Sequence, residues 1–377
     1  MFYPIEQLHA HERLLLHLLW LGIGCKEQAQ VLRTLNPTSP EVWSQVFIAA
    51  SAHQLSAVVW DGLQQALAHN CFRKAQQPSE QMLRAWETHV RKGEKRFSEQ
   101  QQVIASLTRF YNARQTPMML LNGVGIARCY PYPQHRLSGD VDIWLFNRQR
   151  LHEKQLLEEL HAAVWHDAQR QSLYKVEGVL IENYYKLTPR CAHARYDALE
   201  ERLQSLADAC KIPHTAYYST PISPSPQFQI LFMLCRYAYQ FAERGLRLRQ
   251  LTDWALFCAA NHQRIDWHEV NQIASSLGFE AFLEALNRLS VELWGVDRTC
   301  FPPLKASAKY TSQLFEAILH PSFTEMRPRR SWSFATVEFT VRRWWNNRAN
   351  YRMIYRSGRV PALFSQLNHA LRKPQID

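Results

Sequence analysis

The sequence predicts an α+β protein in which a small mixed β-sheet lies between N-terminal and C-terminal helical regions. Apolar residues recur at helical spacing before about residue 112 and again after residue 226. Between them lie short segments rich in apolar and β-branched residues, separated by Gly and Pro turns. The 377 residues suffice for two or three domains, and 46% hydrophobic with 20% charged residues is typical of a soluble globular protein.

Residues 1–114 form the predicted N-terminal helical region. The apolar run of residues 5–21 has helical spacing, and Ser39-Pro40-Glu41 resembles the start of a helix with Pro in its first turn. A long polar helix is expected over about 79–114, with an apolar stripe that includes Trp86 and Tyr111. This region contains no obvious catalytic motif.

Residues 115–219 form the predicted α/β core. We expect a buried strand at 118–121, a turn at Asn122-Gly123, a helical turn at 124–129 and a second strand carrying two carboxylates. A helix over 147–168 and a strand over 179–187 complete the expected order of strand, helix, strand, helix, strand.

Residues 227–377 form the predicted C-terminal helical region, reached through a Pro-rich and Ser-rich linker at 220–226. Helices are expected at 227–243, 248–260 and 267–277, and further ones to about residue 319. No apolar run is as long as a membrane span, and the N-terminus has no cationic leader, so we expect a cytoplasmic protein.

The net charge of +11 is concentrated near the C-terminus. From Glu325 onward there are eleven basic and three acidic residues, so +8 of the excess lies there. Arg alternates with aromatic residues, as in Arg342-Arg343-Trp344-Trp345 and Tyr351-Arg352, a pattern found in nucleic-acid and phospholipid binders. Helices packed by Trp with a solvated basic face have the same pattern, so both interpretations stay open.

The segment Leu137-Ser138-Gly139-Asp140-Val141-Asp142-Ile143-Trp144-Leu145 contains the strongest functional motif. Alternation along a strand puts Asp140 and Asp142 on one face and the aliphatic residues between them on the other. Two adjacent carboxylates repel each other unless a cation lies between them, and hard oxygen ligands suit Mg²⁺ or Mn²⁺. The alternative is a solvated strand end with two ordinary acids.

Two further positions extend this motif. Glu182 interrupts an apolar strand, where an unpaired acid is costly, so it is the candidate third metal ligand; a pair with Lys175 or Lys186 is the alternative. Gly123 follows a strand at a turn where backbone N–H groups can approach a phosphate without a Cβ in the way.

Together these residues resemble the uncharacterised nucleotidyltransferase family of the polymerase-β-like superfamily. The resemblance rests on Leu121-Asn122-Gly123, Arg136, Gly139-Asp140-Val141-Asp142 and the Glu182 strand; the segment 245–254 is similar to the helical part of bacterial members. It implies Asp140, Asp142 and Glu182 as catalytic metal ligands. The nucleotide-binding residues implied are Asn122, Gly123, Arg136, Ser138, Gly139, Arg249 and Asp253.

The resemblance implies transfer of a nucleoside monophosphate from a nucleoside triphosphate to a hydroxyl acceptor, which is a protein, an RNA or a small molecule, with release of pyrophosphate. One position departs from the family, because Asn122 stands where Lys is common and a cationic contact to the triphosphate is lost. The resemblance then implies either that activity is reduced or that Arg136 or Arg128 supplies the missing contact to the triphosphate.

Several alternatives stay open. The chain is a catalytically weakened nucleotide-binding or RNA-binding protein of the same fold, or a glycosyltransferase that uses an Asp-x-Asp metal site. Arg136 either contacts phosphate or holds its loop by hydrogen bonds to carbonyl groups. Arg249 and Asp253 either face the nucleotide or form an ion pair one turn apart on a helix surface.

Overall fold

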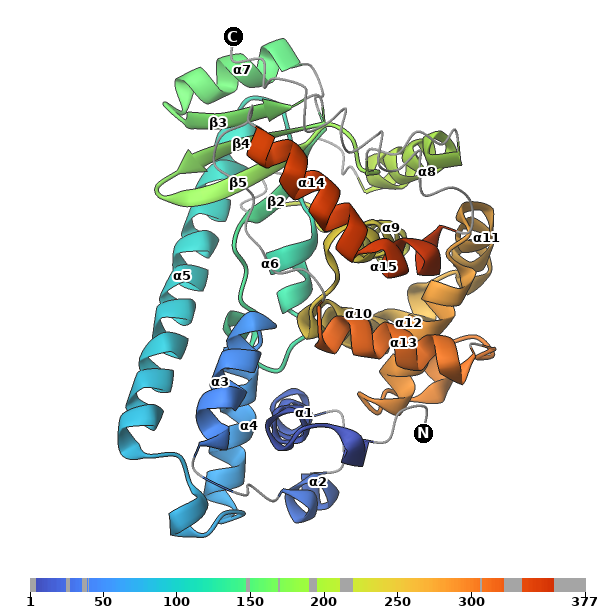
Figure 1. The fold of residues 1–377 in the computed structure, drawn as a ribbon. Helices are drawn as coiled ribbons and strands as arrows, with labels where there is room; N and C mark the ends of the chain where they lie inside the picture. The colour runs from blue at the N-terminus through green and yellow to red at the C-terminus, as the bar shows by residue number, and fades with distance from the viewer. Residues whose placement is uncertain are drawn as a thin grey trace.

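The computed structural model describes most of the chain, and all structural statements below concern these residues. The described ranges are 5–24, 28–35, 39, 41–146, 150–168, 170–189, 195–210, 220–305, 307–321 and 334–355. They form a mixed sheet with helical regions on either side of it in the sequence, which confirms the predicted α+β class (Figure 1).

The N-terminal region is helical, as predicted. Its helices are α1 (Ala10–Ile23), α2 (Gln28–Thr34), α3 (Val42–Ala52), α4 (Ser56–Ala68) and α5 (Glu80–Ala113). The long α5 begins where the Ser79 side chain accepts a hydrogen bond from the Met82 N–H, a typical N-cap. It runs from the N-terminal helices to the sheet, so one rigid element connects the two regions (Figure 1).

Five strands form one sheet in the described part of the chain. They are β1 (Met118–Leu120), β2 (Val141–Leu145), β3 (Ala163–Ala168), β4 (Gln171–Val176) and β5 (Val179–Tyr184), in the spatial order β1-β2-β5-β4-β3. The pairing of β2 with β5 is parallel and the other pairings are antiparallel. The two strands that carry the candidate metal ligands are therefore neighbours at the centre of the sheet.

The two faces of β2 have different surroundings. Val141, Ile143 and Leu145 pack in a core with residues of α5 and α7 (Arg150–Glu159). Trp144, on the other face, belongs to a larger core that also contains the N-terminal and C-terminal helices. The alternation predicted for this strand is therefore confirmed: aliphatic side chains point one way, and Asp142 with Trp144 the other.

The helix predicted over 147–168 is wrong in its second half. Helix α7 ends at Glu159, His161 has a positive φ of 49°, and the chain then continues as strand β3. Pairing with β4 along its length overrides the helical pattern of this segment. Strand β4 and helix α8 (Arg195–Ala209) were not predicted at all.

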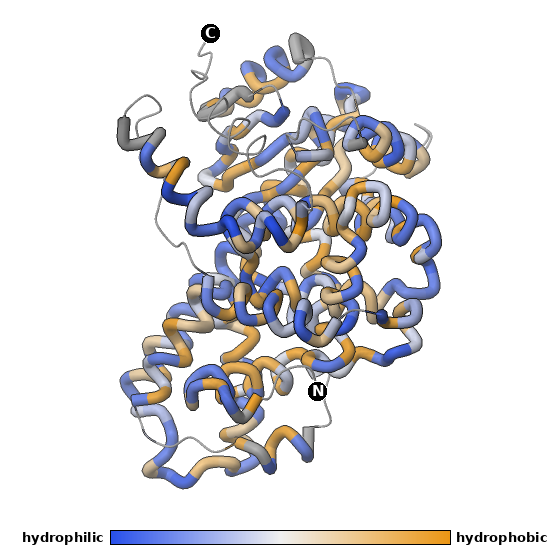
Figure 2. The backbone as a smooth tube through the Cα atoms, turned by 45° about the vertical axis from the view of Figure 1, so that its right-hand side comes forward, coloured by the Kyte–Doolittle hydropathy of each residue, from blue (hydrophilic) through white to orange (hydrophobic). Residues whose placement is uncertain are grey.

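The C-terminal region is helical, as predicted, with hydrophobic and hydrophilic residues mixed along its helices (Figure 2). The helices are α9 (Pro226–Arg244), α10 (Leu248–Asn261), α11 (Trp267–Leu277), α12 (Glu280–Glu292), α13 (Ala308–Leu319), α14 (Phe334–Asn346) and α15 (Arg348–Ile354). Within the predicted linker, Ile222 exchanges backbone hydrogen bonds of 2.9 Å with Met118 and Leu120, so it extends the edge of the sheet at β1.

The larger core combines side chains from α1 to α4, from β1 and β2, and from α9 to α13. The division at residues 114 and 227 stays a prediction, and apolar packing continues across both positions. None of the described helices is long and apolar enough to cross a membrane.

Candidate metal centre and nucleotide site

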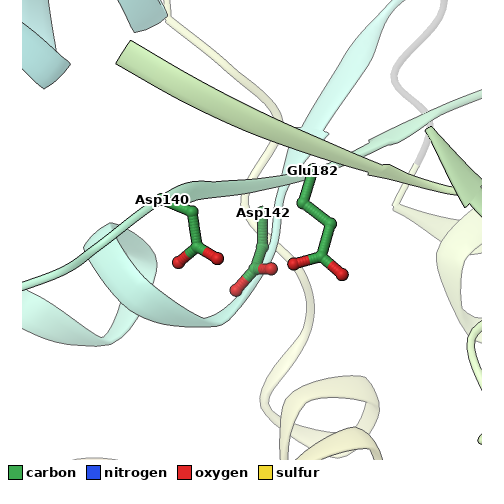
Figure 3. A group of neighbouring side chains, drawn as sticks. All are labelled: Asp140, Asp142 and Glu182. Carbon is green, nitrogen blue, oxygen red and sulfur yellow. The ribbon is translucent and has the colours of Figure 1, made fainter. Parts of the chain in front are cut away.

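Three carboxylates from the two central strands converge on one side of the sheet. In the parallel ladder Asp142 lies directly opposite Glu182, and Asp140 immediately precedes β2 on the same face. One oxygen from each of the three lies within 4.8 Å of the others, and the side chains point in one direction (Figure 3). The strand register thus accounts for the convergence, because opposite residues of paired strands project to the same face.

Burial disfavours ionisation of Asp142 and Glu182. Asp142 is only 7% exposed, and burial raises its pKa to about 7; the nearby charges of Asp140 and Glu182 act in the same direction. Burial raises the pKa of Glu182 as well. Arg236, and neither Lys175 nor Lys186, is the cation that acts most strongly on Glu182, so the alternative lysine pair does not describe this residue.

The donor set fits a hard divalent cation. Two ligand oxygens on opposite sides of a Mg²⁺ ion lie about 4.2 Å apart, since each Mg²⁺–O distance is about 2.1 Å. Adjacent ligands of the same ion lie about 3.0 Å apart, and the oxygens of the three carboxylates, within 4.8 Å of one another, are close to this range. A bound cation also offsets the mutual repulsion of the three clustered acids, of which Asp142 is buried.

Tyr184 and Arg236 also belong to the site, and the sequence analysis missed both. The Tyr184 hydroxyl donates to Asp142 Oδ1 at 3.0 Å and accepts a hydrogen bond from Arg236 of α9. Two signals were available in the sequence. Tyr184 is two residues from Glu182 on a strand and so shares its face, and Arg236 is a single charge within the apolar run of residues 228–238.

The glycine turn lies beside the end of β2. The Leu121 N–H donates to the Asp142 carbonyl at 2.9 Å, and Gly123 then adopts φ +33° and ψ −109°. A Cβ on Gly123 would approach Ser138 Oγ to 3.0 Å, so a larger residue is excluded by contact as well as by conformation. The turn thus fits closely against the loop that carries Arg136 and Ser138.

Asn122 faces away from a phosphate-binding position at this turn. Its side-chain oxygen accepts a hydrogen bond of 2.8 Å from the Gln229 amide of α9, and the residue is 8% exposed. The backbone φ of +36° at this position is one that Asn tolerates better than most residues. Position 122 therefore joins the turn to α9 and supplies no cation.

Arg136 and Asp253 form a buried ion pair. The guanidinium donates from Nε and Nη2 to the two carboxylate oxygens at 3.1 and 2.7 Å, and the Tyr130 hydroxyl donates to the same carboxylate at 2.8 Å. Arg136 is 4% and Asp253 0% exposed. Asp253 is thus not part of a surface pair with Arg249, and Arg136 bonds to a carboxylate rather than to carbonyl groups of its loop.

One nitrogen of Arg136 has no hydrogen-bond partner. Its Nη1 is buried and lies 3.8 Å from the position of a Cβ on Gly123, at the glycine turn. Burial opposes the charge of Arg136, but Asp253 outweighs it and raises the pKa of the guanidinium. The side chain is therefore a fixed cation with an unused donor beside the turn.

The loop before β2 is held from two sides through three consecutive carbonyl groups. Arg249 Nη1 of α10 donates to the Leu137 carbonyl at 2.7 Å, and from α5 Gln100 donates to that of Ser138 and Arg96 to that of Gly139. Ser138 also donates through Oγ to the Asp140 carbonyl at 2.9 Å. Arg249 thus contacts the loop backbone, and Gly139 is exposed where a Cβ would meet no atom within 4 Å.

The structure therefore brings most of the predicted site residues into one region. The carboxylates Asp140, Asp142 and Glu182 converge, and Gly123, Ser138 and Arg136 adjoin one another beside them. The other three predicted residues lie behind these side chains. Asn122 bonds to Gln229, Arg249 to the Leu137 carbonyl group, and Asp253 to Arg136. The predicted substitute cation Arg128 is exposed and bonds to Ser223 Oγ at 3.3 Å.

Comparison with known proteins gives one match. A family model described as an uncharacterised nucleotidyltransferase matches residues 39–295, which include the helices α3 to α5, the whole sheet, the short helix α6 (Asn122–Ala127) and the helices α7 to α12. No curated protein and no solved structure matches the chain. Helices α14 and α15, with their basic and aromatic residues, lie outside the matched range.

Proposed function

Because the chain belongs to the uncharacterised nucleotidyltransferase family, we propose that it transfers a nucleoside monophosphate from a nucleoside triphosphate to a hydroxyl acceptor, with pyrophosphate as the second product. The observation that carries the proposal is the convergence of Asp140, Asp142 and Glu182 on neighbouring strands. In this reaction a bond forms between the acceptor oxygen and the α-phosphorus, and the bond from that phosphorus to the pyrophosphate oxygen breaks.

The three carboxylates would hold Mg²⁺ or Mn²⁺, and Asp142, as the most buried of them, would be the most fixed ligand. When bound, such an ion lowers the pKa of the attacking hydroxyl and neutralises charge on the departing pyrophosphate. Gly123 would offer backbone N–H groups of its turn to a phosphate, and Ser138 and Gly139 would line the approach to Asp140 from the adjoining loop. We assign these roles to the carboxylates and to the loop residues from their positions in the structure.

Arg136 is the residue we assign to the triphosphate at the glycine turn. Its Nη1 is an unpartnered donor close to Gly123, while its other nitrogens are fixed by Asp253. Asp253 and Arg249 are positioning residues in this proposal: Asp253 orients the guanidinium, and Arg249 holds the adjoining loop. Positioning and charge complementarity are the main contributions of a protein to phosphoryl-group transfer.

The experiment is pyrophosphate release with each of four nucleoside triphosphates in Mg²⁺ or Mn²⁺, together with Mn²⁺ binding measured by electron paramagnetic resonance. We expect Asp140→Asn with Asp142→Asn to abolish both while the chain stays folded. The matched control is Glu177→Gln, which removes an exposed carboxylate from the hairpin between β4 and β5. Turnover and Mn²⁺ binding that survive the double substitution would end the proposal.

A second candidate function is nucleotide or RNA binding without turnover. The observation that favours it is Asn122, whose side chain bonds to Gln229 and leaves the turn without the cation that the family resemblance implies. Thermal stabilisation by a nucleoside triphosphate without pyrophosphate release supports this candidate. A response to nucleotide sugars alone supports the glycosyltransferase alternative, against which family membership argues.

For the acceptor, we propose contact with RNA through α14 and α15. Trp345 is 56% exposed, and the Arg348 guanidinium lies over its ring at 4.6 Å. Arg343 lies 3.9 Å from Glu243 near the end of α9, which connects this basic surface to the helix that borders the metal centre. Exposed aromatic rings with neighbouring arginines bind single-stranded nucleic acid by stacking and charge.

A further inference from the structure

One face of α9 borders the candidate site between Gln229 and Arg236. Gln229 of this helix contacts the glycine turn through Asn122, and Arg236, seven residues later, contacts Tyr184 beside the carboxylates. Residues seven apart lie on nearly the same side of a helix and are separated by about 10 Å along its axis. The helix therefore runs from the position expected for the triphosphate to the metal ligands.

Arg236 is fixed in orientation at the metal-ligand end of this face. Its guanidinium donates to the Tyr184 hydroxyl and lies over two aromatic rings, with its central carbon 4.9 Å from the centre of Tyr184 and 5.5 Å from that of Phe232. Tyr184 in turn donates to Asp142. A chain of hydrogen bonds thus connects the cation on α9 to the most buried candidate metal ligand.

The charge of Arg236 suits an anionic ligand better than a purely structural ion pair. A purely structural arginine beside two carboxylates would be expected to form a bidentate pair with one of them. Arg236 instead bonds to a neutral hydroxyl and faces Asp142 and Glu182 without an ion pair to either among the described contacts. Its planar array of donors matches phosphate oxygens.

We propose that Arg236 is a phosphate-binding residue that supplies from α9 the positive charge absent at position 122, and that Tyr184 is the positioning residue that couples it to Asp142. This inference rests on the proposed function, since it assumes a nucleoside triphosphate as the ligand. It assigns the triphosphate two cations from different directions: Arg136 at the glycine turn and Arg236 on the opposite side of the carboxylates.

The proposal predicts that loss of Arg236 has different effects on nucleotide affinity and on metal affinity. A cation beside the carboxylates repels a metal ion, so loss of Arg236 is not expected to weaken metal binding at a pH high enough to keep the carboxylates ionised without it. Loss of a charge-assisted phosphate contact is expected to weaken triphosphate binding about tenfold to a hundredfold. A structural residue whose loss disturbed the carboxylates would weaken binding of both.

The experiment measures Mn²⁺ binding by electron paramagnetic resonance, and binding of ATP, GTP, CTP and UTP, each tested singly with Ca²⁺, by calorimetry. For Arg236→Met we expect Mn²⁺ affinity within about twofold of the wild type and at least tenfold weaker binding of the preferred nucleotide. Arg236→Lys keeps the charge and should lose less, and it replaces the Met variant if that variant does not fold. Tyr184→Phe should reduce nucleotide affinity by a smaller factor.

The matched control is Arg288→Met, which removes a partly buried arginine from α12, a helix that carries none of the site residues. Its nucleotide affinity should equal that of the wild type. Unchanged nucleotide affinity in both Arg236 variants overturns this inference alone, if Asp140→Asn with Asp142→Asn still abolishes Mn²⁺ binding. If that double variant binds Mn²⁺ like the wild type, the proposed function and this inference both fail.

Discussion

The buried pair of Arg136 and Asp253 provides the sharpest test of how the helical region supports the site. Asp253→Asn keeps the shape of the side chain and one acceptor oxygen but removes the charge. In the wild type, Asp253 Oδ2 accepts a hydrogen bond of 2.7 Å from Arg136 Nη2. In the variant an amide NH₂ group replaces one carboxylate oxygen, so two hydrogen-bond donors would face each other. Arg136 would be left as a cation 4% exposed to solvent, without a counter-charge on α10.

The expected loss of stability follows from burial. Removing one partner of a buried ion pair costs about 3 to 5 kcal/mol, and the retained acceptor of Asn puts this substitution near the lower value. Burial opposes ionisation of Asp253, but the charge and hydrogen bonds of Arg136 outweigh it and hold the pKa of this carboxyl below its ordinary value. The contribution of the pair is thus present above about pH 4 and is lost as the pH falls further.

The assay is urea unfolding at pH 7.5, followed by circular dichroism, for the wild type and Asp253→Asn. The double variant Arg136→Met with Asp253→Leu should recover part of the loss, because replacing both members of a buried pair costs less than removing one. As a control, Glu80→Gln breaks an exposed pair with Arg84 and should change nothing measurable. A free energy of unfolding for Asp253→Asn within about 1 kcal/mol of the wild type would refute the reasoning.

Two further predictions concern a histidine and the basic surface. Burial lowers the pKa of His53 to about 4, so this residue should destabilise the fold progressively as the pH falls from about 6.5 to 4, by up to about 3 kcal/mol. His53→Gln should therefore show a shallower loss of unfolding free energy over that range, and an identical slope would contradict the assignment. Trp345→Ala should weaken binding of single-stranded RNA about tenfold in a gel-shift assay, whereas Val341→Ala, a nearby exposed change, should not; equal losses would argue against stacking.

The strand of the candidate metal centre could be predicted because its signal is local. Period-two alternation in residues 140–145 fixes which side chains share a face, whatever the strand pairs with. The parallel register that sets Asp142 opposite Glu182 could not be predicted in this way, because 39 residues and two other strands lie between the two residues in the sequence. Glu182 was identified by the cost of an acid in an apolar strand rather than by any knowledge of that register.

The residues that were misassigned or missed depend on partners far away in the chain. Strand β3 has a helical pattern that pairing with β4 overrides, and the pairing is invisible until β4 itself is recognised. Contact with the nucleotide and a local pair with Arg249 were both open for Asp253, but its partner Arg136 lies 117 residues away. Tertiary contacts of this kind decide the geometry of buried charges, and sequence spacing alone does not reveal them.

The helical regions on both sides of the sheet contribute to the candidate site, because they hold the loop that leads into β2. The Leu137 carbonyl is held by α10, and those of Ser138 and Gly139 by α5, so Asp140 has its position because helices from both ends of the chain fix the preceding backbone. The matched family range, 39–295, contains both helices. A sheet with three carboxylates would not by itself hold Asp140 within metal-bridging distance, since the side chain lies outside the β2 ladder. Helices α5 and α10 thus fix the backbone that orients Asp140, the first of the three clustered carboxylates.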